Sequence, residues 1–130
     1  MDYNYYDILV KPSWAPPKWI FGPVWSFLYI LIIISFSKVF YMYFKKQIPF
    51  MVLLPFVLNI VFNLIFTPIQ FGLKNNYLAF ADIILVLITL VWGMKSIFFY
   101  SKWVSYINIP YLLWVSFATV LQASVTWLNR

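Results

Sequence analysis

The stretch KPSWAPPKWIFGPVWSFLY, residues 11–29, is a rigid aromatic segment that leads directly into a long apolar run. It holds four prolines, three tryptophans and two lysines in nineteen residues. A plain lead-in to a membrane helix needs only one or two interfacial anchors, such as a Trp or a Lys. We therefore expect this segment to cap a binding cavity as well as to enter the membrane.

The composition places the chain in a membrane. The chain has 130 residues, of which 65% are hydrophobic and 9% are charged, and its mean hydropathy is +0.88. Soluble domains carry roughly 25% charged residues, and a soluble domain of this length could not bury so much apolar surface. The sequence therefore predicts one integral-membrane domain over residues 1–130.

Four apolar runs are long enough to cross the hydrocarbon core, which takes about 20 helical residues. They comprise residues 24–44, 48–67, 77–99 and 110–128. Short connections between the runs favour antiparallel neighbours, and runs such as ILIII lack the alternation of a membrane β-barrel. We expect an all-α membrane bundle of four helices, with a lid segment at residues 1–23 and a kink at Pro55.

The net charge of +6 arises from basic residues that flank the apolar runs instead of forming one patch. They are Lys11, Lys18, Lys38, Lys45, Lys46, Lys74, Lys95, Lys102 and Arg130. Such residues anchor spans at the headgroups. With four spans, five of these residues lie toward one side of the membrane and four toward the other, and the positive-inside rule then favours an outward-facing amino-terminal segment. Nucleic acid is not an expected partner. The chain has no cysteine and no histidine, so neither a metal site nor a resident cofactor is expected.

Polar side chains inside the runs are the candidates for function, because each is unfavourable in lipid unless it is paired or faces a cavity. Asn59 and Asn63 are four residues apart and share a helix face. This arrangement is equally consistent with hydrogen bonds to the polar edge of a ligand and with hydrogen bonds between helices. Asp82 stands five residues after Tyr77, near one interface, where Lys74 is a candidate partner. A structural role is favoured for Asp82 over a ligand contact.

The last apolar run places Trp114, Ala118 and Gln122 on one face, because they recur at intervals of four. Such a face could form a slot for a flat molecule, with Trp114 as a stacking wall and Gln122 as a polar contact. A small residue at 118 also permits close approach of a neighbouring helix. Spacing alone favours this second interpretation.

Three blocks of the sequence resemble one known family. They are the opening stretch quoted above, LNIVFNLIFTPIQFGLKNNYLAFADIILV (58–86) and PYLLWVSFATVLQASVTWLNR (110–130). In this order they are similar to the first loop, the central helices and the final helix of the TspO/MBR family of tryptophan-rich sensory proteins and translocator proteins. The resemblance covers nearly the whole chain. It implies a multi-pass protein of a bacterial cell membrane.

The resemblance also implies a site among the helices. Members of the family bind porphyrins such as protoporphyrin IX, beneath a lid formed by the first loop. By position, the site is expected to be formed by Trp25, Asn59, Asn63, Trp114, Ala118 and Gln122. The lid is expected to include Trp14, Pro16 and Pro17, whose prolines would hold it in one shape.

One feature departs from the family, whose members generally have five membrane helices. Only ten residues, MDYNYYDILV, precede Lys11 in this chain, and ten residues cannot span a bilayer. We expect either a four-helix member or a helix supplied by a partner, with an exposed groove where the fifth helix would lie. A homodimer is a further expectation.

The expected function is that of an integral-membrane receptor or carrier for flat hydrophobic ligands, in contact with membrane lipid. Two alternatives stay open. The first is a light-dependent porphyrin-degrading enzyme in which Trp25 and Trp114 take part in photo-oxidation. The second is a small structural membrane subunit that needs a partner.

Overall fold

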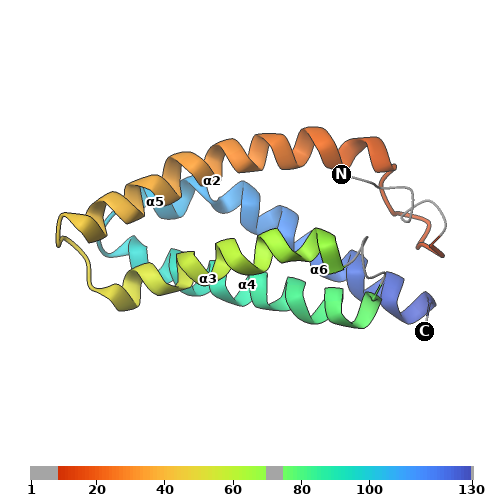
Figure 1. Cartoon of the computed structure of the whole chain (residues 1–130). Helices are drawn as coiled ribbons and strands as arrows, with labels where there is room; N and C mark the ends of the chain where they lie inside the picture. Colours follow the sequence, from red (N-terminus) through yellow and green to blue (C-terminus); the bar gives the residue numbers. More distant parts are fainter. Residues whose placement is uncertain (1–8, 70–74, 130) are drawn as a thin grey trace.

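The computed structural model describes residues 9–69 and 75–129, and all the secondary structure in these ranges is helical (Figure 1). The elements are η1 (Lys18–Ile20), α2 (Phe21–Phe44), α3 (Phe50–Thr67), α4 (Asn76–Phe98), α5 (Lys102–Ile107) and α6 (Ile109–Leu128). The predicted all-α membrane bundle is therefore confirmed. Residues 1–8 of the predicted lid segment lie outside the described ranges.

Three stretches of the described chain are long and apolar enough to cross a membrane: α2, α4 and the continuous pair of α5 and α6, Lys102–Leu128. α3 is also apolar, but it has 18 residues and so measures about 27 Å. α5 lies in a connection for which the sequence predicted no helix. It lengthens the last apolar stretch to 27 residues.

α2 begins three residues before the predicted span, so Gly22 and Pro23 belong to the helix and not to the lid. A proline is compatible with a first helical turn, because its fixed φ is helical and the amide hydrogen that it lacks would have no partner there. α3 continues as an α-helix through Pro55, which lies inside it.

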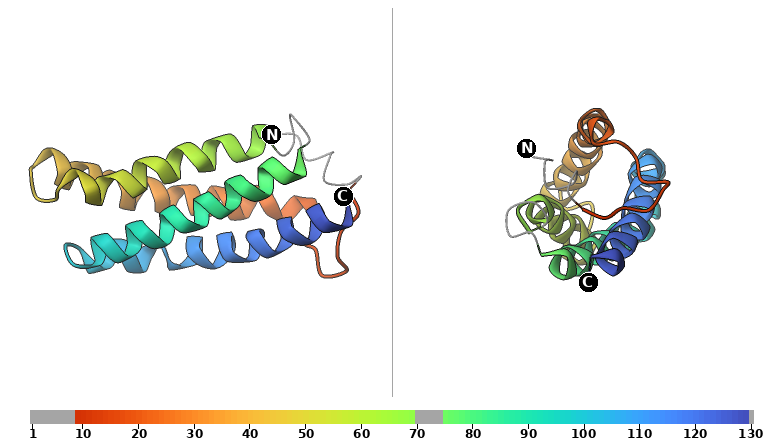
Figure 2. Two further views of the ribbon diagram at one scale, coloured as in Figure 1. Left: turned by 90° about the horizontal axis from the view of Figure 1, so that it is seen from below. Right: turned by 90° about the vertical axis from the view of Figure 1, so that its right-hand side faces the viewer.

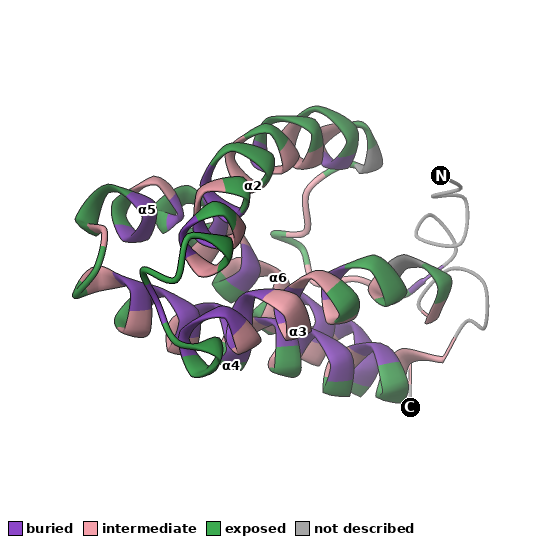
Figure 3. Cartoon of the chain, turned by 60° about the vertical axis from the view of Figure 1, so that its left-hand side comes forward, coloured by how far each residue is buried: buried purple, intermediate pink, exposed green. Residues whose placement is uncertain are grey.

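The helices run side by side in an elongated bundle, with both described chain ends at the same end of it (Figure 2). α4 packs against α3 on one side and against α6 on the other, and its buried residues face these neighbours (Figure 3). At Gly93 a Cβ atom would lie 3.1 Å from the ring of Phe56. The absence of a side chain therefore lets α3 approach α4 closely.

α2 exposes apolar side chains along its length. Phe27, Ile30, Ile33 and Ile34 are all at least half exposed, as expected for side chains that meet lipid tails. Its inner face still joins the core, where Phe36 packs edge-on against Phe56 with 4.9 Å between ring centroids. α2 is therefore the outer wall of the bundle.

Candidate functional site

Aromatic rings from three parts of the chain meet at the lid end of the bundle. The aromatic cluster comprises Trp14 before α2, Phe21 and Trp25 on α2, and Trp114 and Phe117 on α6. Trp114 is at its centre, with ring centroids 6.0 Å from Phe21, 6.5 Å from Trp25 and 5.4 Å from Phe117. Most of these contacts are edge-on, which is a favoured arrangement for aromatic pairs.

The described part of the lid, residues 9–20, crosses this end of the bundle (Figure 2). Trp14 packs edge-on against Phe117, with 5.7 Å between ring centroids, and Leu9 joins a small apolar cluster with Leu121 and Val125. Pro16 is partly buried and Pro17 is exposed. The Pro17 carbonyl accepts a hydrogen bond from the Ile20 amide, and this bond closes the turn into η1.

Asn129 fixes the start of the lid to the end of α6. The Val10 amide donates to Asn129 Oδ1 over 3.1 Å, and Asn129 Nδ2 donates to the Val10 carbonyl over 2.8 Å. This reciprocal pair holds the lid at its first described residues, while Trp14 holds it further along. The lid is therefore docked at two points.

We expect Asn129→Ala to release the first of these points and leave the second intact. The Val10 amide should then exchange its hydrogen about fivefold faster, because a hydrogen bond of roughly 1 kcal/mol is lost. Hydrogen–deuterium exchange of detergent-solubilised protein measures this change. Exchange within α4 serves as the internal reference and should not change. An unchanged rate at Val10 would contradict the docking role of Asn129.

A chain of hydrogen bonds joins four helices below the aromatic cluster. Tyr29 on α2 donates to Asn63 Oδ1 over 3.0 Å, and Asn63 Nδ2 donates to the Tyr111 hydroxyl over 2.7 Å. Tyr111 donates to Asn59 Oδ1 over 2.9 Å. Asn59 Nδ2 in turn donates to the Val86 carbonyl on α4 over 2.9 Å. We call Tyr29, Asn59, Asn63 and Tyr111 the polar network.

The polar network gives both members of the asparagine pair partners on other helices. Both carboxamides make hydrogen bonds between helices, and Asn59 and Tyr111 are 1% and 0% exposed. The sequence analysis did not identify Tyr29 or Tyr111. The only sequence signal for Tyr29 was its position four residues after Trp25, on the same face of α2.

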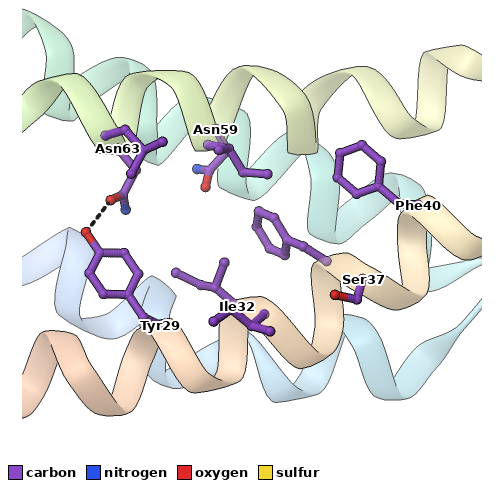
Figure 4. Close-up of a pocket in the computed structure, with 10 residues that line it drawn as sticks. Tyr29, Ile32, Ser37, Phe40, Asn59 and Asn63 are labelled. Carbon is purple, nitrogen blue, oxygen red and sulfur yellow. Dashed lines mark hydrogen bonds between the residues drawn. The ribbon is translucent and has the colours of Figure 1, made fainter.

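A cavity of about 270 Å³ lies between α2 and α3 (Figure 4). Its wall contains Tyr29, Asn59 and Asn63 together with apolar side chains of both helices. The other predicted site residues, Trp25, Trp114, Ala118 and Gln122, do not line it. Pockets for small molecules usually measure about 300–1,000 Å³, so this cavity is small for a large planar ligand.

Gln122 lies away from the cavity and joins α6 to the start of α4. Its Nε2 donates to Thr126 Oγ1 over 3.2 Å and lies 3.4 Å from the Asn76 carbonyl. The Thr126 hydroxyl donates to the same carbonyl over 3.1 Å. Ala118 is partly buried against the main core. Of the predicted residues on this face of α6, Trp114 is the one that lies in the aromatic cluster.

Three buried polar atoms have no hydrogen-bond partner among the described residues: Asn108 Oδ1, toward the end of the bundle opposite the lid, and two others. The other two are Nε1 of Trp114 and Oδ2 of Asp82, and the Asp82 residue is 3% exposed. Lys74, a possible partner suggested by the sequence, lies outside the described ranges. An unpaired buried polar group is unfavourable by about 1–3 kcal/mol, so these atoms could pair with a ligand. Within the described ranges, no group of acidic residues could hold a metal ion.

Comparison with known proteins identifies the family. The TspO/MBR family profile matches residues 1–128. The chain is 37% identical over 125 residues to the tryptophan-rich protein TspO of Chlorobaculum tepidum, covering 96% of this chain and 79% of that protein. It is 38% identical over 129 residues to the protein of the same name from Bacillus cereus, covering 99% and 83%.

A further relative is less similar in sequence. The human translocator protein is 30% identical over 127 residues, covering 94% of this chain and 73% of that protein. These matches agree with the membrane-spanning helices of the structure. The protein is an integral membrane protein and belongs to the TspO/MBR family.

Proposed function

We propose that the protein binds flat hydrophobic ligands, porphyrins such as protoporphyrin IX foremost, within the membrane. The observation that carries this proposal is the aromatic cluster beneath a docked lid, with Trp25 and Trp114 6.5 Å apart between ring centroids. Planar macrocycles stack on indole rings, and such contacts combine a large apolar area with a fixed geometry. The relatives include a protein named tryptophan-rich sensory protein, from Cereibacter sphaeroides.

The unpaired indole nitrogen of Trp114 supports the proposal. A ligand that carries a hydrogen-bond acceptor, such as a carboxylate of the porphyrin, would give this N–H group the partner that it lacks. Metal-free porphyrin suits the chain better than haem, because the chain contains no histidine or cysteine to act as an axial iron ligand.

Binding requires the cluster to open, because Trp25 and Trp114 now contact each other. α2 carries Trp25 and has an exposed apolar face, and the Tyr29–Asn63 hydrogen bond ties it to α3. Displacement of α2 from α3 would enlarge the small cavity between them and separate the two indoles. We infer that α2 and the lid are the elements that move.

Tryptophan fluorescence in the dark tests the proposal. Titration of the detergent-solubilised protein with protoporphyrin IX should give saturable quenching that is weakened by Trp114→Phe and by Asn59→Ala. Absence of saturable quenching in a folded preparation would refute porphyrin binding. The exposed apolar face of α2 would then favour the membrane subunit that packs against a partner.

Illumination of the same samples tests the enzymatic alternative, which the neighbouring indoles of Trp25 and Trp114 favour. A photo-oxidation catalyst should convert many equivalents of porphyrin per protein in the presence of dioxygen. Loss of no more than one equivalent, together with tryptophan oxidation, would show photobleaching of a bound ligand instead of turnover.

A further inference from the structure

We propose a second binding site, for the headgroup of an anionic phospholipid, at the end of the bundle opposite the lid. The site is an open pocket of about 600 Å³ beside the turn between α2 and α3. Its wall consists of Tyr43, Phe44, Lys46, Gln47, Ile48, Pro49, Phe50 and Tyr100. Donor groups and exposed aromatic rings are thus combined at one place, independently of the aromatic cluster.

The backbone of the turn fixes the position of Lys46 in this pocket. The Lys46 amide donates to the Tyr43 carbonyl over 2.9 Å, and the Gln47 amide donates to the Met42 carbonyl over 2.8 Å. These two bonds form a complete Schellman motif at the end of α2. Lys46 occupies its left-handed position, with a φ of 60°, and therefore has a defined place at the pocket.

The charge at this end of the bundle has a single sign. Five lysines lie there, and the sequence has no acidic residue between Lys38 and Asp82 or after Asp82. They are Lys38, Lys45, Lys46, Lys95 and Lys102. Asp82, the only acid in the described ranges, is buried on α4. Basic pockets between membrane helices attract anionic headgroups.

Lys46 differs from its neighbours in the partners of its ammonium group. Lys38 and Lys45 lie over the Tyr41 ring, 5.2 Å and 5.8 Å from its centroid, and Lys102 lies over Phe98 at 5.5 Å. Within the described ranges, Lys46 makes no such contact and no ion pair. Its ammonium group is therefore the one in the pocket that remains open to a phosphate.

The apolar part of the pocket favours a lipid over a free phosphate ion. Phe44 is 73% exposed and Phe50 is 51% exposed, and Tyr43 contacts both rings. Aromatic side chains at this depth sit at the headgroup level. Acyl chains could pack along these rings while Lys46, Gln47 and Tyr100 bind the phosphate group.

Native mass spectrometry of the detergent-solubilised protein tests the site with phosphatidylglycerol and phosphatidylcholine as probes. The wild type should bind phosphatidylglycerol more tightly, and Lys46→Gln should weaken that binding about fivefold. Lys95→Gln is the matched control, because it removes the same charge at the same end but outside this pocket. It should have little effect, and Lys46→Arg should retain binding.

Three outcomes would overturn the proposal. Equal weakening by Lys46→Gln and Lys95→Gln would show diffuse surface attraction instead of a site. Equal affinity of the wild type for the two lipids would leave the lysines with a role in membrane orientation only. Displacement of the lipid by millimolar glycerol phosphate would show that the pocket binds the phosphate group without the acyl chains.

Discussion

Tyr111→Phe is expected to lower the free energy of unfolding by about 2 kcal/mol. The substitution keeps the shape of a side chain that is fully buried but removes the hydroxyl at the centre of the polar network. Asn63 then loses an acceptor and Asn59 loses a donor. Each hydrogen bond between membrane helices contributes about 0.6 to 1.7 kcal/mol, and the unpaired carboxamide atoms stay buried.

Denaturant unfolding in mixed micelles, followed by tryptophan fluorescence, measures this effect. Tyr106→Phe is the matched control, because Tyr106 is 57% exposed on α5 and should change stability little. Tyr29→Phe removes only the terminal hydrogen bond of the network and should have an intermediate effect. Equal stability of the Tyr111→Phe and Tyr106→Phe variants would contradict a stabilising network.

Trp114→Ala is expected to weaken protoporphyrin binding about 30-fold, the value for loss of a central aromatic contact of roughly 2 kcal/mol. Trp114 contacts Phe21, Trp25 and Phe117, so its removal eliminates the centre of the aromatic cluster. The lost N–H group adds to the effect. Dark titrations that follow porphyrin absorbance measure the affinity without relying on tryptophan emission.

The control for this prediction is Trp103→Ala. Trp103 lies on α5 at the opposite end of the bundle and is 46% exposed, so its removal should leave porphyrin affinity unchanged. Thermal unfolding of both variants checks that the helical bundle persists. A folded Trp114→Ala variant with wild-type affinity would exclude the aromatic cluster as the porphyrin site.

The membrane helices were predictable because the length of an apolar run is a local property of the sequence. α5 was not predictable, since a helix of six residues is too short to show the helical periodicity of apolar residues. It precedes Tyr111, which follows Pro110 at the start of α6. Tyr111 lies about 13 Å beyond Lys102 along this stretch and is fully buried because it packs in the core of the bundle.

The site residues were predictable only in part, because hydrogen-bond partners on other helices are not visible in the sequence. Spacing placed Trp114 and Gln122 on one face of α6, yet Trp114 lies in the aromatic cluster and Gln122 bonds to the start of α4. Spacing likewise paired Asn59 with Asn63. That they bond through Tyr111 depends on how α3 and α6 both pack against α4.

The most direct test of the central claim is residue-resolved tryptophan oxidation after a short illumination of the protoporphyrin complex. Excited porphyrin oxidises nearby indoles in the presence of dioxygen, and peptide mass spectrometry identifies them. We expect Trp25 and Trp114 to be modified first, to an extent that saturates with porphyrin concentration. Preferential oxidation of Trp103 and Trp127, which are 46% and 64% exposed, would show that porphyrin binds at the surface and would contradict a site within the bundle.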